Sequence, residues 1–172
     1  DDWFANADRN GARILPTILE SHSPLDLIII MLGTNDLKPM LGRTAREAGR
    51  GMVRLVHIIR GHYAQKREPE PKIILVAPPA ITDTDNMDMI QHFGGHGMIA
   101  ESQQFPTHYQ RHANDFGVGF FDAATVAKAD PRDGVHLDPA NTRAIGEGLV
   151  PLATLDALVE NAKRMIALNR RV

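Results

Sequence analysis

The sequence predicts an α/β fold in which a doubly wound parallel sheet has helices on both faces. Two continuous apolar runs, 25–32 and 72–77, are typical of strands that are buried on both sides in a parallel sheet. Between them, residues 44–60 place apolar side chains at helical spacing with arginines opposite. Strands that alternate with helices through short connections indicate βαβ units with right-handed crossovers.

The composition is that of one ordinary globular domain over residues 1–172. The chain is 43% hydrophobic and 23% charged, which is enough for a single core. Its formal net charge is -2, with both signs interspersed, so it has no basic stripe for nucleic acid and no polybasic segment for a membrane. The longest apolar run, 27–32, is too short to cross a bilayer. We therefore expect a small-molecule substrate.

Two features bear on the cellular context. The chain has no cysteine, which excludes a disulfide framework, a thiolate metal site and a cysteine nucleophile. It begins at Asp1 without an initiator Met and without a signal-like apolar segment. We expect a cytoplasmic protein, and we expect that a segment upstream of this chain has been removed, nicked or left out.

The remaining elements follow from turn and capping signals. Residues 11–22 predict a short helix, and the helix after Thr44, a plausible N-cap, is expected to run through Arg60 and end at Gly61. The polar residues 80–97 predict a long irregular loop. The other expected elements are a helix kinked or divided at Pro106, a third strand, a loop, and a closing helix broken near Pro151: 98–116, 118–121, 130–136 and 139–168.

A first polar motif, Gly33-Thr34-Asn35-Asp36, follows the first predicted strand. Ligands collect at the carboxyl ends of strands in such sheets. Glycine permits a sharp turn there, and the Asn35 amide can project above the sheet as a hydrogen-bond donor. Because Asn and Asp favour turns for purely local reasons, a plain turn is an equal alternative for this motif alone.

A second motif, Asp133-Gly134-Val135-His136, lies in the predicted loop at 130–136. A carboxylate three residues before an imidazole can hold one ring nitrogen and aim the other at a nucleophile. Taken alone, two unrelated polar residues in a surface loop would be the more common explanation. The order and context of the two motifs change that balance.

Residues 32–36 resemble the Gly-x-Asn-Asp block of SGNH (GDSL-like) hydrolases, and residues 133–137 resemble their C-terminal Asp-x-x-His block, in family order and at family-like separation. Residues 24–36, 76–79 and 120–123 are similar to the branch of aryl esterases, carbohydrate acetylesterases and acyltransferases. The resemblance spans most of the chain. It implies a flavodoxin-like, doubly wound sheet of the SGNH type and a serine ester hydrolase.

The resemblance also implies roles for individual residues. His136 would be the general base, Asp133 the carboxylate that orients it, and Asn35 an oxyanion donor. Thr34, Lys38 and Val135 flank these residues and would bind substrate. No cofactor is expected. No metal is expected either, because the histidine pairs at positions 92 and 96 and at 108 and 112 lack a third ligand in a recognisable pattern.

The sequence departs from the family pattern at the nucleophile. Gly-Asp-Ser does not occur, and Ser21, Ser23 and Ser102 lie in other contexts, so none of them is nominated. The first βα unit of the fold is therefore expected to be absent from this chain. We expect the catalytic serine on a companion N-terminal fragment of the same protein, at least ~30 residues long and held by the sheet. A homo-oligomer is also expected.

The function implied by the resemblance is removal of short acyl groups, above all acetyl, from carbohydrate or small aryl or alkyl esters through an acyl-enzyme. Acyl transfer to an alcohol is a second outcome of the same chemistry. A catalytically inactive SGNH-like binding domain is one alternative. A flavodoxin-like nucleotide-binding domain is another, although the sequence shows no phosphate-binding glycine fingerprint.

Overall fold

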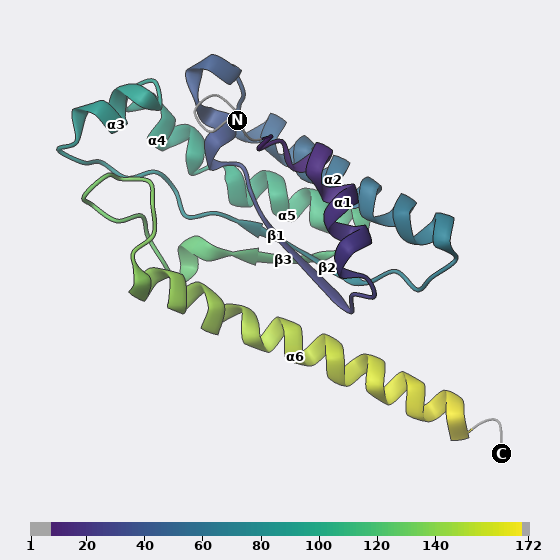
Figure 1. Ribbon diagram of the computed structural model, residues 1–172. Coiled ribbons are helices and arrows are strands. Elements are labelled where there is room, and N and C mark those ends of the chain that lie inside the picture. The colour runs from purple at the N-terminus through teal and green to yellow at the C-terminus, as the bar shows by residue number, and fades with distance from the viewer. Residues whose placement is uncertain (1–7, 170–172) are drawn as a thin grey trace.

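The computed structural model describes residues 8–169, with side chains up to Thr154. Its three strands form one parallel sheet in the order β1-β2-β3 (Figure 1), with the bounds Leu27–Met31, Lys72–Ala77 and Gly119–Asp122. Helices lie on both faces of this sheet (Figure 1). The predicted parallel α/β fold is confirmed.

The core has two layers, one on each side of β2. Ile73 and Leu75 point into a cluster with helices α1 (Gly11–His22), α2 (Ala45–Lys66) and α5 (Phe105–Phe116). Ile74 and Val76 point to the other face, where they pack with Ile145 of helix α6 (Pro139–Asn169). All four β2 side chains are buried because β2 has a strand on each side and helices above and below.

Strand β1 is less covered than its sequence predicts. Ile30 is buried against the α1 and α2 side, whereas Ile29 is 43% exposed and Met31 is 40% exposed. Within residues 8–169, β1 pairs only with β2, and its other edge has no strand. The prediction of burial on both faces is therefore wrong for β1, because α6 packs over β2 and β3 and leaves much of this face of β1 open.

The bounds of the helices correct several predictions. Thr44 is confirmed as the N-cap of α2, in a capping box with Glu47. The helix does not end at Gly61 but continues to Lys66, because buried Tyr63 extends its apolar stripe by another turn. Helix α6 likewise runs through Pro151 without a break.

The segment predicted as irregular, 80–97, contains a short helix, α3 (Met87–His92), whose N-cap is Asn86. The following helical region is divided ahead of Pro106 into α4 (Gly97–Ser102) and α5, as expected. Among residues 8–169 there are also three 3-10 turns: η1 (Thr34–Leu37), η2 (Pro39–Leu41) and η3 (Ala123–Thr125). No helix in residues 8–169 has the length and hydropathy that a membrane crossing requires.

Candidate active site

Glycine is required where β1 turns into η1. Gly33 has a φ of 131°, and a Cβ there would lie 2.1 Å from the hydroxyl oxygen of Tyr109. That hydroxyl donates to the carbonyl of Leu32 at 2.7 Å. Burial raises the pKa of Tyr109 far above its usual value, so the hydroxyl remains a proton donor. The end of β1 is thus held on α5, and η1 begins at a defined place.

The η1 turn presents the first predicted motif. The backbone N–H of Asp36 donates to the carbonyl of Gly33 at 2.8 Å and closes the turn. Asn35 is exposed at the surface of this turn, and Thr34 is half-buried. Burial raises the pKa of Asp36, and the charge of Arg43 offsets part of this effect. A role for Asp36 in supporting the turn agrees with its position.

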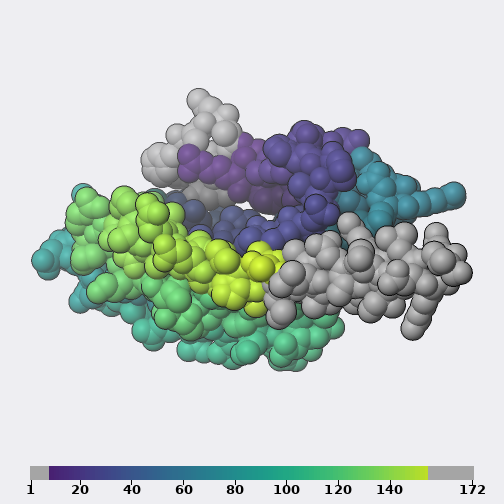
Figure 2. Space-filling view, turned by 90° about the horizontal axis from the view of Figure 1, so that it is seen from below, coloured from purple at the N-terminus to yellow at the C-terminus, as the bar shows by residue number. Residues whose placement is uncertain are grey.

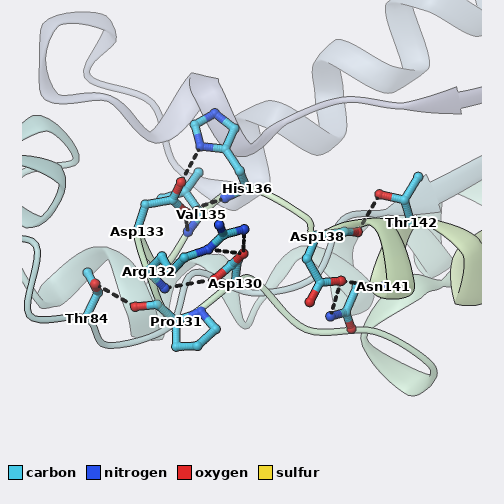
Figure 3. A network of polar contacts seen from close by, with 10 residues as sticks. All are labelled: Thr84, Asp130, Pro131, Arg132, Asp133, Val135, His136, Asp138, Asn141 and Thr142. Carbon is cyan, nitrogen blue, oxygen red and sulfur yellow. Dashed lines mark hydrogen bonds and ion pairs between the residues drawn. The ribbon is translucent and has the colours of Figure 1, made fainter.

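The second motif forms a hydrogen-bonded pair. His136 Nδ1 lies 2.8 Å from Asp133 Oδ2, while Asp133 Oδ1 accepts from the backbone N–H groups of Val135 and His136 at 2.9 and 2.8 Å. Figure 3 shows the imidazole with one nitrogen on this carboxylate and the other pointing away from it. The His136 side chain is 73% exposed, so its second nitrogen is accessible. This is the geometry that the Asp-x-x-His spacing predicts.

Asp130 shapes the loop that carries this pair. Its carboxylate accepts from the backbone N–H of Arg132 at 2.9 Å and from the Arg132 guanidinium (Figure 3). Its carbonyl accepts from the N–H groups of Asp133 and Gly134 at 3.2 and 2.7 Å. The backbone ahead of His136 is therefore folded by local hydrogen bonds to Asp130, in addition to those that Asp133 accepts.

Contacts to residues that follow β2 fix the loop from outside. The carbonyl of Gly134 accepts from the N–H of Thr82 at 2.9 Å, and the Thr84 hydroxyl donates to the carbonyl of Pro131 at 2.8 Å. Gly134 has a φ of 74°, and a Cβ there would lie 2.4 Å from the carbonyl oxygen of Thr82. The close approach of these two backbones accounts for glycine between Asp133 and His136.

The ionised form of Asp133 is favoured in the folded protein. Burial acts to raise its pKa, but the N–H groups of Val135 and His136 and the imidazole outweigh that effect, and the pKa of Asp133 lies below its ordinary value. A carboxylate of this kind stabilises the fold above its unfolded pKa of about 3.9, and the contribution is lost as pH falls through the folded value.

We therefore expect the stability difference between the native protein and Asp133→Asn to depend on pH. The native protein should be more stable above about pH 5, and its advantage should shrink as pH falls below about 4. Urea unfolding of both proteins at a series of pH values measures the difference. An advantage that stays constant down to the lowest pH would contradict the placement of charge on Asp133.

A cleft of about 840 Å³ brings the two motifs together. Figure 2 shows the surface hollowed between α1, in purple, and the body of the molecule that carries α6. Thr34, Asn35, Val135 and His136 all line this cleft. Lys38 does not line it. It is buried, with its ammonium group 5.8 Å from the centre of the Phe93 ring.

The three serines of the chain lie elsewhere. Ser21 Oγ contacts the carbonyl of Ile18 and its neighbour His22, and Ser23 Oγ donates to the carbonyl of Leu19 at 2.6 Å. Ser102 is fully buried. None of them lines the cleft, so the imidazole of His136 has no serine partner among residues 8–154.

The sequence matches the model of one protein family along most of its length. Residues 2–144 match the GDSL-like lipase/acylhydrolase family. The chain belongs to this family. Membership in the GDSL-like family confirms the resemblance seen in residues 32–36 and 133–137, and it sets aside the nucleotide-binding alternative.

Solved structures of esterases resemble this GDSL-like chain. A carbohydrate acetylesterase family member from Sinorhizobium meliloti is 44% identical with a TM-score of 0.85, over 91% of this chain and 73% of its own. A carbohydrate acetylesterase from the same organism is 35% identical with a TM-score of 0.78, over 88% and 71%. The M. smegmatis aryl esterase is 33% identical with a TM-score of 0.75, over 91% and 71%. No curated protein gives a significant match.

In the part of the chain that the structure describes, no group of three or more His, Cys, Asp or Glu side chains is placed to hold a metal ion. His108 and His112 instead lie against Gly49, where an added Cβ would be 3.2 and 3.1 Å from them.

The two supports of the site that the sequence did not reveal are Tyr109 and Asp130, since neither lies in a recognisable motif.

Proposed function

We propose that this GDSL-like chain forms part of a serine ester hydrolase that removes short acyl groups, above all acetyl, from carbohydrate or small aryl or alkyl esters. The observation that carries the proposal is the Asp133–His136 pair, with its second ring nitrogen accessible in the cleft that Asn35 also lines. The esterases with similar structures support the choice of substrate class.

The reaction proceeds in two steps. A serine hydroxyl attacks the ester carbonyl and gives its proton to the free nitrogen of His136, while Asp133 stabilises the imidazolium. The tetrahedral intermediate expels the alcohol, which takes that proton, and leaves an acyl-enzyme. Water then attacks the acyl group through the same base. The Asn35 amide donates to the oxyanion in both steps.

The serine comes from a companion segment of the same protein. We place this segment as a parallel strand on the open edge of β1, where it would cover the exposed side chains of Ile29, Met31 and Leu32. That edge leads directly to Gly33 and the cleft, so a residue that follows the added strand would lie near His136.

Fluorophosphonate labelling tests the proposal, because the reagent modifies activated serines. The protein expressed from its full coding region is labelled, denatured and weighed by mass spectrometry. We expect the label on a serine outside residues 1–172, and we expect His136→Ala to abolish it. A protein that contains the companion segment but takes no label would instead be the inactive binding domain.

Replacing Asn35 by alanine should slow the reaction without abolishing it. Loss of one oxyanion donor typically lowers turnover about 100- to 1000-fold. Steady-state kinetics on p-nitrophenyl acetate should show this loss in kcat. Asn86→Ala, which removes an amide from the N-cap of α3 outside the cleft, is the matched control and should leave kcat unchanged. Equal losses in the two variants would show a general effect on folding.

Acyl transfer is the second outcome of the same intermediate. An alcohol that enters the cleft in place of water would take the acyl group from the serine. Assays in mixtures of water and alcohol measure the ratio of new ester to free acid. A ratio that exceeds the molar ratio of alcohol to water would make the protein an acyltransferase as well as a hydrolase.

A further inference from the structure

One wall of the cleft is rich in arginine. Helix α2 contributes Arg50 and Arg54, which are one helical turn apart, and Arg9 lines the cleft just ahead of α1. All three side chains belong to exposed residues. Their guanidinium groups keep their charge at any physiological pH. They share this cleft with Asn35 and His136.

The carboxylates that line the cleft do not offset these charges. Glu47 is engaged at the start of α2, where it accepts from the N–H of Thr44 at 3.0 Å and pairs with Arg43 at 3.6 Å. Asp36 is the other acidic residue in the described lining, which therefore holds four arginines against two carboxylates. Within residues 8–154, Arg9, Arg50 and Arg54 form no ion pair with a carboxylate. The cleft therefore keeps a surplus of positive charge.

We infer that the cleft is built for an anionic ester, whose alcohol part carries a carboxylate. This inference rests on the proposed esterase function. With a short acyl group at Asn35 and His136, the larger alcohol part must extend along the rest of the cleft, toward α2. A carboxylate on that part reaches Arg50 and Arg54, and a guanidinium can hold it through two parallel hydrogen bonds. Acetyl esters of acidic sugars and of aryl carboxylic acids belong to this class.

In residues 8–154 the cleft measures about 840 Å³, and the companion strand proposed above would occupy the part of it beside Met31 and Leu32. The ligand would take the remaining part, between His136 and the arginines of α2. The positive charges of the arginines would raise the local concentration of anions at the cleft. A neutral ester of the same shape would gain nothing from these charges, so the arginines act on specificity and not on the chemical step.

The experiment compares 4-acetoxybenzoate with its neutral methyl ester. Arg50→Gln and Arg54→Gln are each expected to raise KM for the anionic ester about tenfold, since each removes a charged hydrogen bond, with kcat unchanged. KM for the neutral ester should stay the same. Arg46→Gln is the matched control, because Arg46 is exposed on the same helix but does not line the cleft. The preference for the anion should weaken at high salt.

Titration calorimetry with 4-hydroxybenzoate, the product, gives a readout without turnover. If neither ester is hydrolysed but Arg50→Gln weakens binding of this anion, the inference stands and the proposed reaction fails. If KM rises equally for both esters in Arg50→Gln, or if Arg46→Gln raises KM for the anionic ester as much, the inference is overturned. If KM changes equally for both esters in Arg50→Gln and the companion segment no longer stays bound to this chain, the arginines bind a carboxylate of that segment and not of the substrate.

Discussion

Replacing His136 by alanine is expected to lower kcat for a short-chain ester by about 10⁴-fold and to leave the fold intact. The imidazole would both accept the serine proton and return it to the leaving alcohol, so no other group in the cleft can replace it. Its side chain is 73% exposed and carries little of the core, which is why folding should survive. Steady-state kinetics and circular dichroism measure the two properties.

A matched control comes from another histidine on a carboxylate. His96 lies 3.3 Å from Asp83, on an exposed loop that does not line the cleft. His96→Ala should keep full activity. Asp133→Ala should lose nearly as much as His136→Ala, and the double variant little more, because the pair acts as a unit. Activity retained in His136→Ala would overturn the proposed base.

The substitution Gly33→Ala should strongly destabilise the folded protein. The new Cβ would lie 2.1 Å from the Tyr109 hydroxyl oxygen, at a backbone φ of 131° that side chains rarely adopt. Backbone strain and overpacking each cost about 1–3 kcal/mol, so we expect a loss of about 4 kcal/mol in the free energy of unfolding. Denaturant unfolding monitored by circular dichroism measures it.

Two further variants separate the causes. Gly61→Ala, at a helical position in α2 with open space around it, should raise stability by up to about 1 kcal/mol. Tyr109→Phe combined with Gly33→Ala removes the clashing oxygen and should recover part of the loss. If Gly33→Ala has the same free energy of unfolding as the native protein, the Tyr109 hydroxyl does not lie against Gly33.

Elements whose signals are local could be predicted from the sequence. The continuous apolar run 72–77 became β2 without any shift of its ends, because both faces of a central strand are buried. Pro106 marked the division between α4 and α5, since proline is favoured in the first turn of a helix. Thr44 was found through its capping chemistry.

Elements that depend on tertiary contacts could not be predicted from the sequence. Gly61 is a strong local stop signal, yet the burial of Tyr63 in the core carries α2 past it. The exposure of Ile29 and Met31 depends on where α6 packs, which no pattern in 25–32 reveals. Asn86 was a usable signal for α3, because asparagine is favoured at helix N-caps. In the structure its side-chain oxygen accepts from the backbone N–H of Met89.

The candidate site also has features that local sequence predicts and features that depend on the tertiary fold. Asp133 and His136 are three residues apart, so their contact follows from loop geometry, whereas their approach to Asn35 depends on the parallel order of the strands. Lys38 is near Asn35 in sequence, but its side chain lies against Phe93 and outside the lining of the cleft. The roles of these residues in catalysis and binding stay predictions.

The bond between Gly134 and Thr82 has a dynamic consequence. Because the backbones of the 130–136 loop and of the residues after β2 meet at 2.9 Å, neither segment can open alone without breaking it. Their amide hydrogens should therefore exchange with solvent as one cooperative unit. A substitution near Thr82 that never touches substrate would then change how often His136 is in position, and so the frequency of productive encounters.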